Sequence, residues 1–275
     1  GYPESAARAL AHAAGYREWR DAPRGVVPEL AGVDTGAARR VVAGFLAGEP
    51  GGGWLPAAAA GELLACYGIS MVDTEAVTGP EAAVAAAGRL GGRVVLKAEA
   101  DGVVHKSAAG AVRLDLRTAG EVAGAYAELA VAFGDRLRRV LVQPMLAGGV
   151  ETMVGVVAEP VFGPLVVFGL GGVAADVLGD RAARLAPLTD VDAAAMLGAV
   201  RAAPLLAGLA GGPAADTSAL AGLLLRVSRL ADDQPEVAEL DLNPVIARPD
   251  GAYPVDVRVR LAPAAPGDPF LRQLR

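Results

Sequence analysis

Pairs of apolar, strand-like runs that lie close together in the chain limit most strongly what this protein can fold into. Val150 to Val157 and Val161 to Phe168 are separated by little more than Glu159-Pro160. Strands this close in sequence pair as hairpins, whereas alanine-rich runs with helical spacing, such as 118–133 and 218–231, separate other strands. This mixture predicts an α+β fold with mixed sheets rather than a doubly wound parallel sheet.

Composition excludes several classes of protein. The 275 residues are 53% hydrophobic but only 4% aromatic, so the core must be built from Ala, Val and Leu. A net charge of -6 without a basic block argues against a nucleic-acid partner. The longest uncharged apolar run, 160–175, is too short and too rich in Pro and Gly to span a membrane. The single Cys66 excludes an internal disulfide and suits a reducing, cytoplasmic setting.

A cationic stretch follows one of the buried strands. Val94 to Leu96 ends on Lys97, and His105-Lys106-Ser107 follows after a short turn, with small residues around Gly110. Lysine is a point charge suited to phosphate, small residues let backbone N–H groups approach an anion, and histidine can act as a nucleophile. The pattern indicates a phosphate site, but it is equally compatible with a solvated lysine and a hydrogen-bonded histidine.

A second polar cluster lies on two strands near the end of the chain. Asp241 and Asn243 share one face of a strand whose other face carries Leu240 and Leu242, and Asp256 lies on the next strand. Carboxylate and amide oxygens together with phosphate are the ligands that Mg²⁺ prefers. The alternative is an ordinary solvated strand face.

A third cluster is glycine-rich. Phe168-Gly169-Leu170-Gly171-Gly172 is followed by Asp176, Asp180 and Arg184, and its spacing fits neither a dinucleotide fingerprint nor a P-loop. These glycines indicate a tight turn or close strand packing.

The order of these motifs resembles the ATP-grasp region of NDP-forming acyl-CoA synthetases. The resemblance covers roughly Trp54 to Pro263 and rests on motifs in this order: Val95-Leu96-Lys97, His105-Lys106-Ser107, Val142-Gln143-Pro144-Met145, Gly149-Val150-Glu151, Phe162-Gly163-Pro164, Phe168 to Gly172, Leu185-Ala186-Pro187-Leu188, Glu239 to Pro244 and Val255-Asp256. It implies an ATP-grasp fold with two α+β lobes, the nucleotide between them, preceded by a short helical segment.

The same resemblance implies a division of the chain. Residues 1–50 would be the helical end of a CoA-ligase region plus a linker, 51–262 the ATP-grasp domain with two subdomains, and 263–275 a tail.

The resemblance also implies roles for individual residues. Nucleotide phosphate would be held by Lys97 with Lys106, Ser107 and Gly110; backbone groups between Gln143 and Met145 would face the adenine, and Glu151 would take the ribose hydroxyls. Asn243 and Asp256 would bind Mg²⁺, with Asp241 supporting them. The implied cofactors are ATP or ADP and Mg²⁺.

His105 would pass phosphate between the nucleotide and a phosphohistidine on a CoA-binding, CoA-ligase partner, in the same longer chain or a separate subunit. Because that partner is absent from this sequence, we expect an acid–CoA ligase (ADP-forming) component that is inactive alone. The alternative is a catalytically weak regulatory or scaffold domain of a protein lysine acetyltransferase fused to a GNAT domain. The intact Lys97, His105, Asn243 and Asp256 favour retained nucleotide binding. The alternative is favoured by Ala108, Ala109 and Gly110-Ala111, which stand where the family often has an acidic residue and a Gly-Gly pair.

Overall fold

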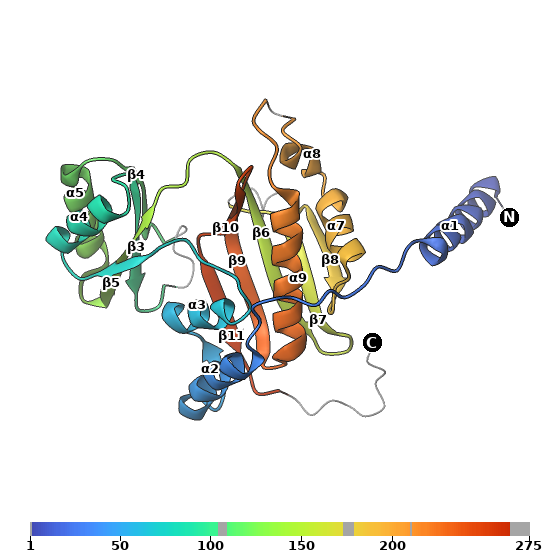
Figure 1. Ribbon diagram of the computed structural model, residues 1–275, viewed down its shortest axis with the longest axis horizontal. Helices are drawn as coiled ribbons and strands as arrows, with labels where there is room; N and C mark the ends of the chain where they lie inside the picture. Colours follow the sequence, from blue (N-terminus) through green and yellow to red (C-terminus); the bar gives the residue numbers. More distant parts are fainter. Residues whose placement is uncertain (1, 104–108, 173–178, 210, 265–275) are drawn as a thin grey trace.

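The computed structural model describes residues 2–103, 109–172, 179–209 and 211–264, and of Trp19 only the backbone. Two sheets organise these residues, and Figure 1 shows them side by side as two lobes. The larger sheet has the strand order β1-β11-β9-β6-β7-β8, with β10 paired to β9, and the smaller has the order β2-β5-β3-β4. This confirms the predicted α+β class with two lobes.

The strands of the larger sheet are β1 (Gly53–Trp54), β6 (Val150–Glu159), β7 (Gly163–Leu170), β8 (Arg181–Leu185), β9 (Val237–Arg248), β10 (Gly251–Pro254) and β11 (Val257–Leu261). Those of the smaller sheet are β2 (Glu75–Val77), β3 (Val94–Ala100), β4 (Val112–Leu116) and β5 (Leu137–Pro144). The helices are α1 (Pro3–Asp21), α2 (Thr35–Gly48), α3 (Ala57–Ala65), α4 (Pro80–Arg89), α5 (Ala119–Phe133), the 3₁₀ turn η1 (Gly134–Arg136), α7 (Asp190–Ala199), α8 (Ala203–Leu206) and α9 (Thr217–Asp233).

The prediction of mixed sheets was wrong for the described strands. Every described pair of neighbouring strands is antiparallel. Helix α5 does connect two strands that run parallel, β4 and β5, but β3 lies between them and pairs with both. A helical crossover therefore need not produce a parallel neighbour when the chain skips a strand.

The smaller lobe is closed by α4 and α5, which pack on one face of its sheet. Its core is made mostly of Ala, Val and Leu, including Ala83, Ala86, Leu96 and Leu129. Small side chains at the contact let helices and sheet approach closely, as the low aromatic content led us to expect. Thr118 begins α5 with a capping box in which its side chain and that of Glu121 exchange hydrogen bonds with the backbone.

The larger lobe buries one face of its sheet under α3, α7 and α9. Helix α9 lies over β6 and β7 in Figure 1, and its apolar side chains belong to the same buried core as Val154, Val156, Leu240 and Leu242. The alternation of β9 leaves Glu239 and Asp241 on the opposite face of the sheet. The second face of this sheet is therefore the one that carries the polar cluster.

Three local features follow from the structure rather than from residue type alone. Helix α4 begins at Pro80 after Gly79 without a side-chain cap, so Thr78 is not its cap. Trp54 belongs to β1 rather than to the following helix, which begins after Pro56. The strand through Asn243-Pro244 is not broken, because β9 continues to Arg248 with a shift in its pairing to β6.

An extended segment, residues 22–33, fastens the first helix to the larger lobe. The N–H of Val26 donates to Asp190 Oδ1 (2.8 Å), and the N–H of Asp190 donates to the Val26 carbonyl (3.0 Å). Helix α1 stands away from the lobes in Figure 1, and its described side chains are exposed. Helix α2, capped by Asp34, instead packs Ala38 and Val42 into the core of the larger lobe. No helix among the described residues has the length and apolar character needed to cross a membrane.

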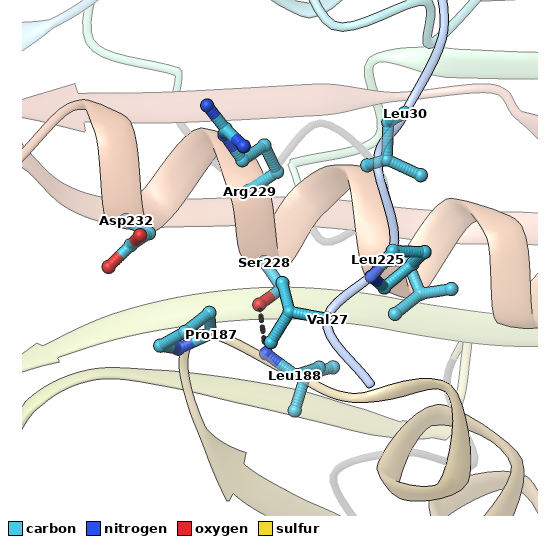
Figure 2. A pocket seen from close by; sticks show the side chains of 9 residues that line it. Val27, Leu30, Pro187, Leu188, Leu225, Ser228, Arg229 and Asp232 are labelled. Carbon is cyan, nitrogen blue, oxygen red and sulfur yellow. Dashed lines mark hydrogen bonds between the residues drawn. The ribbon is translucent and has the colours of Figure 1, made fainter. Parts of the chain in front are cut away.

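A small pocket lies beneath this segment. Figure 2 shows it between Val27 and Leu30, the Pro187-Leu188 loop and Leu225 of α9, where the Leu188 N–H donates to Ser228 Oγ (2.7 Å). Its volume is about 70 Å³, which is far below the roughly 300–1,000 Å³ of small-molecule sites. It is a packing seam and not a nucleotide site.

Tyr67 provides a test of the buried polar packing of the larger lobe. Its side chain is fully buried, and its hydroxyl accepts a hydrogen bond from Gln234 Nε2 (3.0 Å). Burial raises the pKa of Tyr67 to about 12. We expect Tyr67→Phe to lower the free energy of unfolding by about 1–3 kcal/mol, because the buried Gln234 amide loses its acceptor. Denaturant unfolding measures this, with Tyr2→Phe, an exposed tyrosine just before helix α1, as the control; equal stability of the two variants would contradict the prediction.

Candidate functional site

Lys97 joins the two lobes. It lies on β3 of the smaller sheet, is only 7% exposed, and its Nζ donates to the carbonyl of Val255 in the larger lobe (2.6 Å). Val255 directly precedes Asp256 in the sequence, so the buried cation contacts the residue next to a predicted metal ligand. A buried ammonium needs hydrogen-bond acceptors to offset its lost hydration, and this carbonyl supplies one.

Asn243 and Asp256 are neighbours across two paired strands. In the antiparallel register of β9 and β11, Leu242 lies opposite Val257. The pairing continues in the connection, where the N–H of Val255 donates to the Pro244 carbonyl (3.1 Å). Asn243 and Asp256 therefore occupy opposing positions on the face that lies away from the core. Strand pairing thus places these two residues, which the sequence separates by twelve others, opposite each other and next to Val255, the residue that Lys97 contacts.

Glu151 and Asn243 meet at a glycine that follows β7. The N–H of Gly172 donates to Asn243 Oδ1 (3.1 Å), and that of Gly171 donates to the Glu151 carbonyl (2.9 Å). Gly172 has a φ of +66°, and a Cβ there would collide with the Glu151 carboxylate. A Cβ at Gly171 would collide with the Thr152 carbonyl. The glycine-rich cluster thus serves close strand packing, as predicted, and this packing brings Glu151 to the site.

Asp241 lies two residues before Asn243 on β9 and forms an ion pair with Arg258. Its Oδ2 accepts from Arg258 Nη2 (2.6 Å), and Arg258 lies over the ring of Trp54 at 5.6 Å from the ring centre. Its Oδ1 is buried and has no hydrogen-bond partner in the part of the chain that the structure describes. Sequence reasoning missed Arg258 and Trp54, although the alternation of Val257, Arg258 and Val259 already placed the arginine on the polar face.

The predicted adenine segment forms the end of β5. The buried Gln143 side chain donates through Nε2 to Thr74 Oγ1 (2.7 Å), so it turns towards the chain before β2. The N–H of Met145 donates to the Arg93 carbonyl (2.8 Å). This hydrogen bond occupies the Met145 N–H. The backbone group of Met145 that could contact an adenine is therefore its carbonyl.

The remaining predicted residues lie on the β3–β4 connection. His105, Lys106 and Ser107 lie outside the described residues. Gly110 is exposed with a φ of +67°, and its carbonyl accepts from Arg113 Nη1 (2.8 Å). Ala111 begins the return towards β4, where Val112 lies opposite Lys97.

Asp180, from the third motif, has a structural role. Its carboxylate accepts hydrogen bonds from the N–H groups of Arg201 (2.8 Å) and Ala202 (2.9 Å). The bond from Arg201, followed by that from Ala202, lowers the pKa of this carboxyl. Asp180 therefore holds the turn before α8 to the start of β8.

The oxygen donors fit Mg²⁺ only as part of a site that a phosphate completes. Among the described residues there is no group of three or more His, Cys, Asp and Glu side chains that could hold a metal. Asn243, Asp256 and the unpartnered Asp241 Oδ1 nevertheless offer hard oxygen donors in one place. Mg²⁺ is usually held by one or two carboxylates together with phosphates and waters, so this donor set suits a metal that arrives with a nucleotide.

Comparison with known proteins identifies a matching protein family. A family model described as an ATP-grasp domain matches residues 47–261. The beta subunit of acetate–CoA ligase (ADP-forming) I from Pyrococcus furiosus is 36% identical over 205 residues, which cover 73% of this chain and 88% of that subunit. The single-chain acetate–CoA ligase (ADP-forming) I from Archaeoglobus fulgidus is 40% identical over 204 residues, and this chain spans only 30% of its length.

A solved structure shows the same fold. It is acetyl-coenzyme A synthetase 1 of Ca. Korarchaeum cryptofilum in complex with coenzyme A and Mg-AMPPCP, with a phosphohistidine segment pointing towards the nucleotide binding site. The TM-score is 0.69 at 36% identity, and the match covers 81% of this chain and 99% of that chain.

Proposed function

The chain belongs to the ATP-grasp family of ADP-forming acyl-CoA synthetases, and from this premise we propose that it binds ADP or ATP with Mg²⁺ between its lobes and relays phosphate. In the complete enzyme, acyl-CoA, ADP and phosphate would be interconverted with the acid, CoA and ATP. The observation that carries the proposal is the contact of Lys97 with the Val255 carbonyl. It places a buried cation of one lobe beside the Asn243–Asp256 pair of the other.

This arrangement suits a nucleotide polyphosphate. Lys97 offers a fixed positive charge to phosphate oxygens, and Asn243 and Asp256 would hold Mg²⁺, which neutralises the remaining charge when bound. The Glu151 carboxylate, which packs against Gly172, would accept hydrogen bonds from the ribose hydroxyls. The Met145 carbonyl would accept a hydrogen bond from the adenine amine. The related synthetase holds Mg-AMPPCP, which supports ATP or ADP and Mg²⁺ as the ligands.

His105 would carry the phosphoryl group. An imidazole nitrogen attacks the γ-phosphorus of ATP, a P–N bond forms, and the P–O bond to ADP breaks; the group then passes to a histidine of the partner. The reverse sequence makes ATP. We assign Lys106, Ser107 and Gly110 to the cradle of the transferred phosphate.

The partner would be a CoA-binding, CoA-ligase region that carries a phosphohistidine. The beta-subunit relatives support a separate partner subunit, and the single-chain relative supports a partner region in the same chain. Residues 1–50 would then be the end of such a region, and the cytoplasm stays the predicted location. A regulatory role beside a GNAT acetyltransferase domain stays a prediction of the sequence alone.

Asp256→Ala tests the metal role. We expect ADP affinity in the presence of Mg²⁺ to fall by about tenfold, because a carboxylate that acts through the ion is lost. In EDTA the affinity should be nearly unchanged, since the carboxylate does not then contact the phosphates. Titration calorimetry under both conditions measures this. Equal losses under the two conditions would show a direct contact or a damaged fold, and wild-type protein that fails to bind ADP in Mg²⁺ would refute the proposed function.

A further inference from the structure

The two carboxylate oxygens of Asp241 lie in different surroundings. Oδ2 accepts from Arg258 Nη2 (2.6 Å), whereas Oδ1 is buried without a hydrogen-bond partner among the described residues. The side chain is 16% exposed. A buried acceptor without a donor is unfavourable, and native proteins provide such atoms with a partner, a water or a ligand. We therefore expect Oδ1 to accept a hydrogen bond from a bound water or ligand.

Arg258 determines how Asp241 can orient. It lies directly opposite Asp241 in the register of β11 and β9, neighbouring strands in Figure 1, and its guanidinium covers the Trp54 ring at 5.6 Å. The planar guanidinium is thus held between an aromatic face and a carboxylate. One oxygen of Asp241 is engaged by this arrangement, and the other stays available.

The position of Asp241 relates it to the metal pair. Asp241 and Asn243 are two residues apart on β9, on the face away from the core, so their Cα atoms are separated by roughly 7 Å. Asn243 and Asp256 supply the direct donors of the proposed metal site, and Asp241, whose Oδ2 is engaged by Arg258, can support the metal through a water molecule. Mg²⁺ usually keeps several of its waters.

We propose that Arg258, supported by Trp54, is a positioning residue that holds Asp241 so that Oδ1 accepts a hydrogen bond from a Mg²⁺-bound water. This inference rests on the proposed function. Arg258 contacts neither nucleotide nor metal and acts through Asp241 alone.

The test compares two arginines of the same strand. Arg260 pairs with Glu239 on the next rung of the same ladder, at 3.5 Å, and provides the matched control. In the full 275-residue chain, we expect Arg258→Met to weaken ADP binding in Mg²⁺ by about fivefold to tenfold, with no change in EDTA. Arg260→Met should change neither. If Arg258→Met matches Arg260→Met while wild-type protein binds Mg²⁺–ADP, this inference fails and the proposed function stands.

A double-mutant cycle separates positioning from general damage. If Arg258 acts through Asp241, adding Arg258→Met to Asp241→Ala should produce no further loss of Mg²⁺-dependent affinity. Additive losses would overturn the proposal. The signal of Mn²⁺ in the ADP complex, followed by electron paramagnetic resonance, should change in Arg258→Met and not in Arg260→Met.

If Arg258→Met does not fold, Trp54→Leu provides a second test, because it leaves the ion pair between Arg258 and Asp241 in place. We expect a smaller loss of ADP affinity that is again confined to Mg²⁺. A loss of equal size in EDTA, or no loss at all, would refute the supporting role of Trp54.

Discussion

Replacing His105 with alanine is expected to abolish phosphoryl transfer to this chain while ADP affinity stays nearly unchanged. The imidazole is the nucleophile of the proposed relay, so its removal eliminates the P–N intermediate. Binding should persist because the proposal assigns it to Lys97 and the Asn243–Asp256 pair rather than to the imidazole. The measurement is the formation of phosphohistidine after mixing with a CoA-binding partner that is itself phosphorylated on histidine, together with ADP titration.

His12→Ala is the matched control for this experiment, because the chain has two histidines. His12 lies in the exposed helix α1, which stands away from both lobes in Figure 1. We expect its variant to be labelled like wild type. Undiminished labelling of His105→Ala would exclude the relay, and loss of labelling in His12→Ala alone would transfer the role to the other histidine.

Replacing Lys97 with methionine is expected to weaken nucleotide binding by on the order of 10- to 100-fold, since a lost charge-assisted hydrogen bond costs about 1.5–3 kcal/mol. The side chain is buried at the contact between the lobes and donates to the Val255 carbonyl. Methionine keeps an unbranched apolar side chain that reaches nearly as far, and it lacks the ammonium. The loss should appear in Mg²⁺ and in EDTA alike, because the cation meets phosphate directly. This distinguishes Lys97 from Asp256, whose effect should depend on the ion.

Arg139→Met provides the control for Lys97→Met. Arg139 is a cation of the same lobe, paired with Glu99 at 2.5 Å on the neighbouring strand, and the proposal gives it no role. Wild-type affinity in Lys97→Met, with thermal unfolding unchanged in both variants, would exclude a phosphate contact by Lys97. An equal loss in the two variants would point to the net charge of the lobe instead.

Local chemistry could be predicted from neighbouring residues. The side chain of Asp34 accepts from the Ala37 N–H, and Thr118 forms a capping box with Glu121, as helix-starting residues of these types do. The alternation of Leu240, Asp241 and Leu242 correctly predicted which face of β9 is buried. Caps and strand alternation involve residues within four positions of each other, so they do not depend on the rest of the fold.

The sequence by itself determined the fold family, the α+β class and the polar face of β9, because these follow from motif order and short-range periodicity. Only the tertiary structure decided what the polar side chains meet. Lys97 reaches the Val255 carbonyl across 158 positions, Asn243 lies opposite Asp256 because of strand register, and Asp241 is held by Arg258. The same register shows that the strands are antiparallel throughout the described sheets, against our prediction. Such contacts depend on how one lobe and one strand are placed against another, and the spacing of residues along a chain carries no measure of that placement.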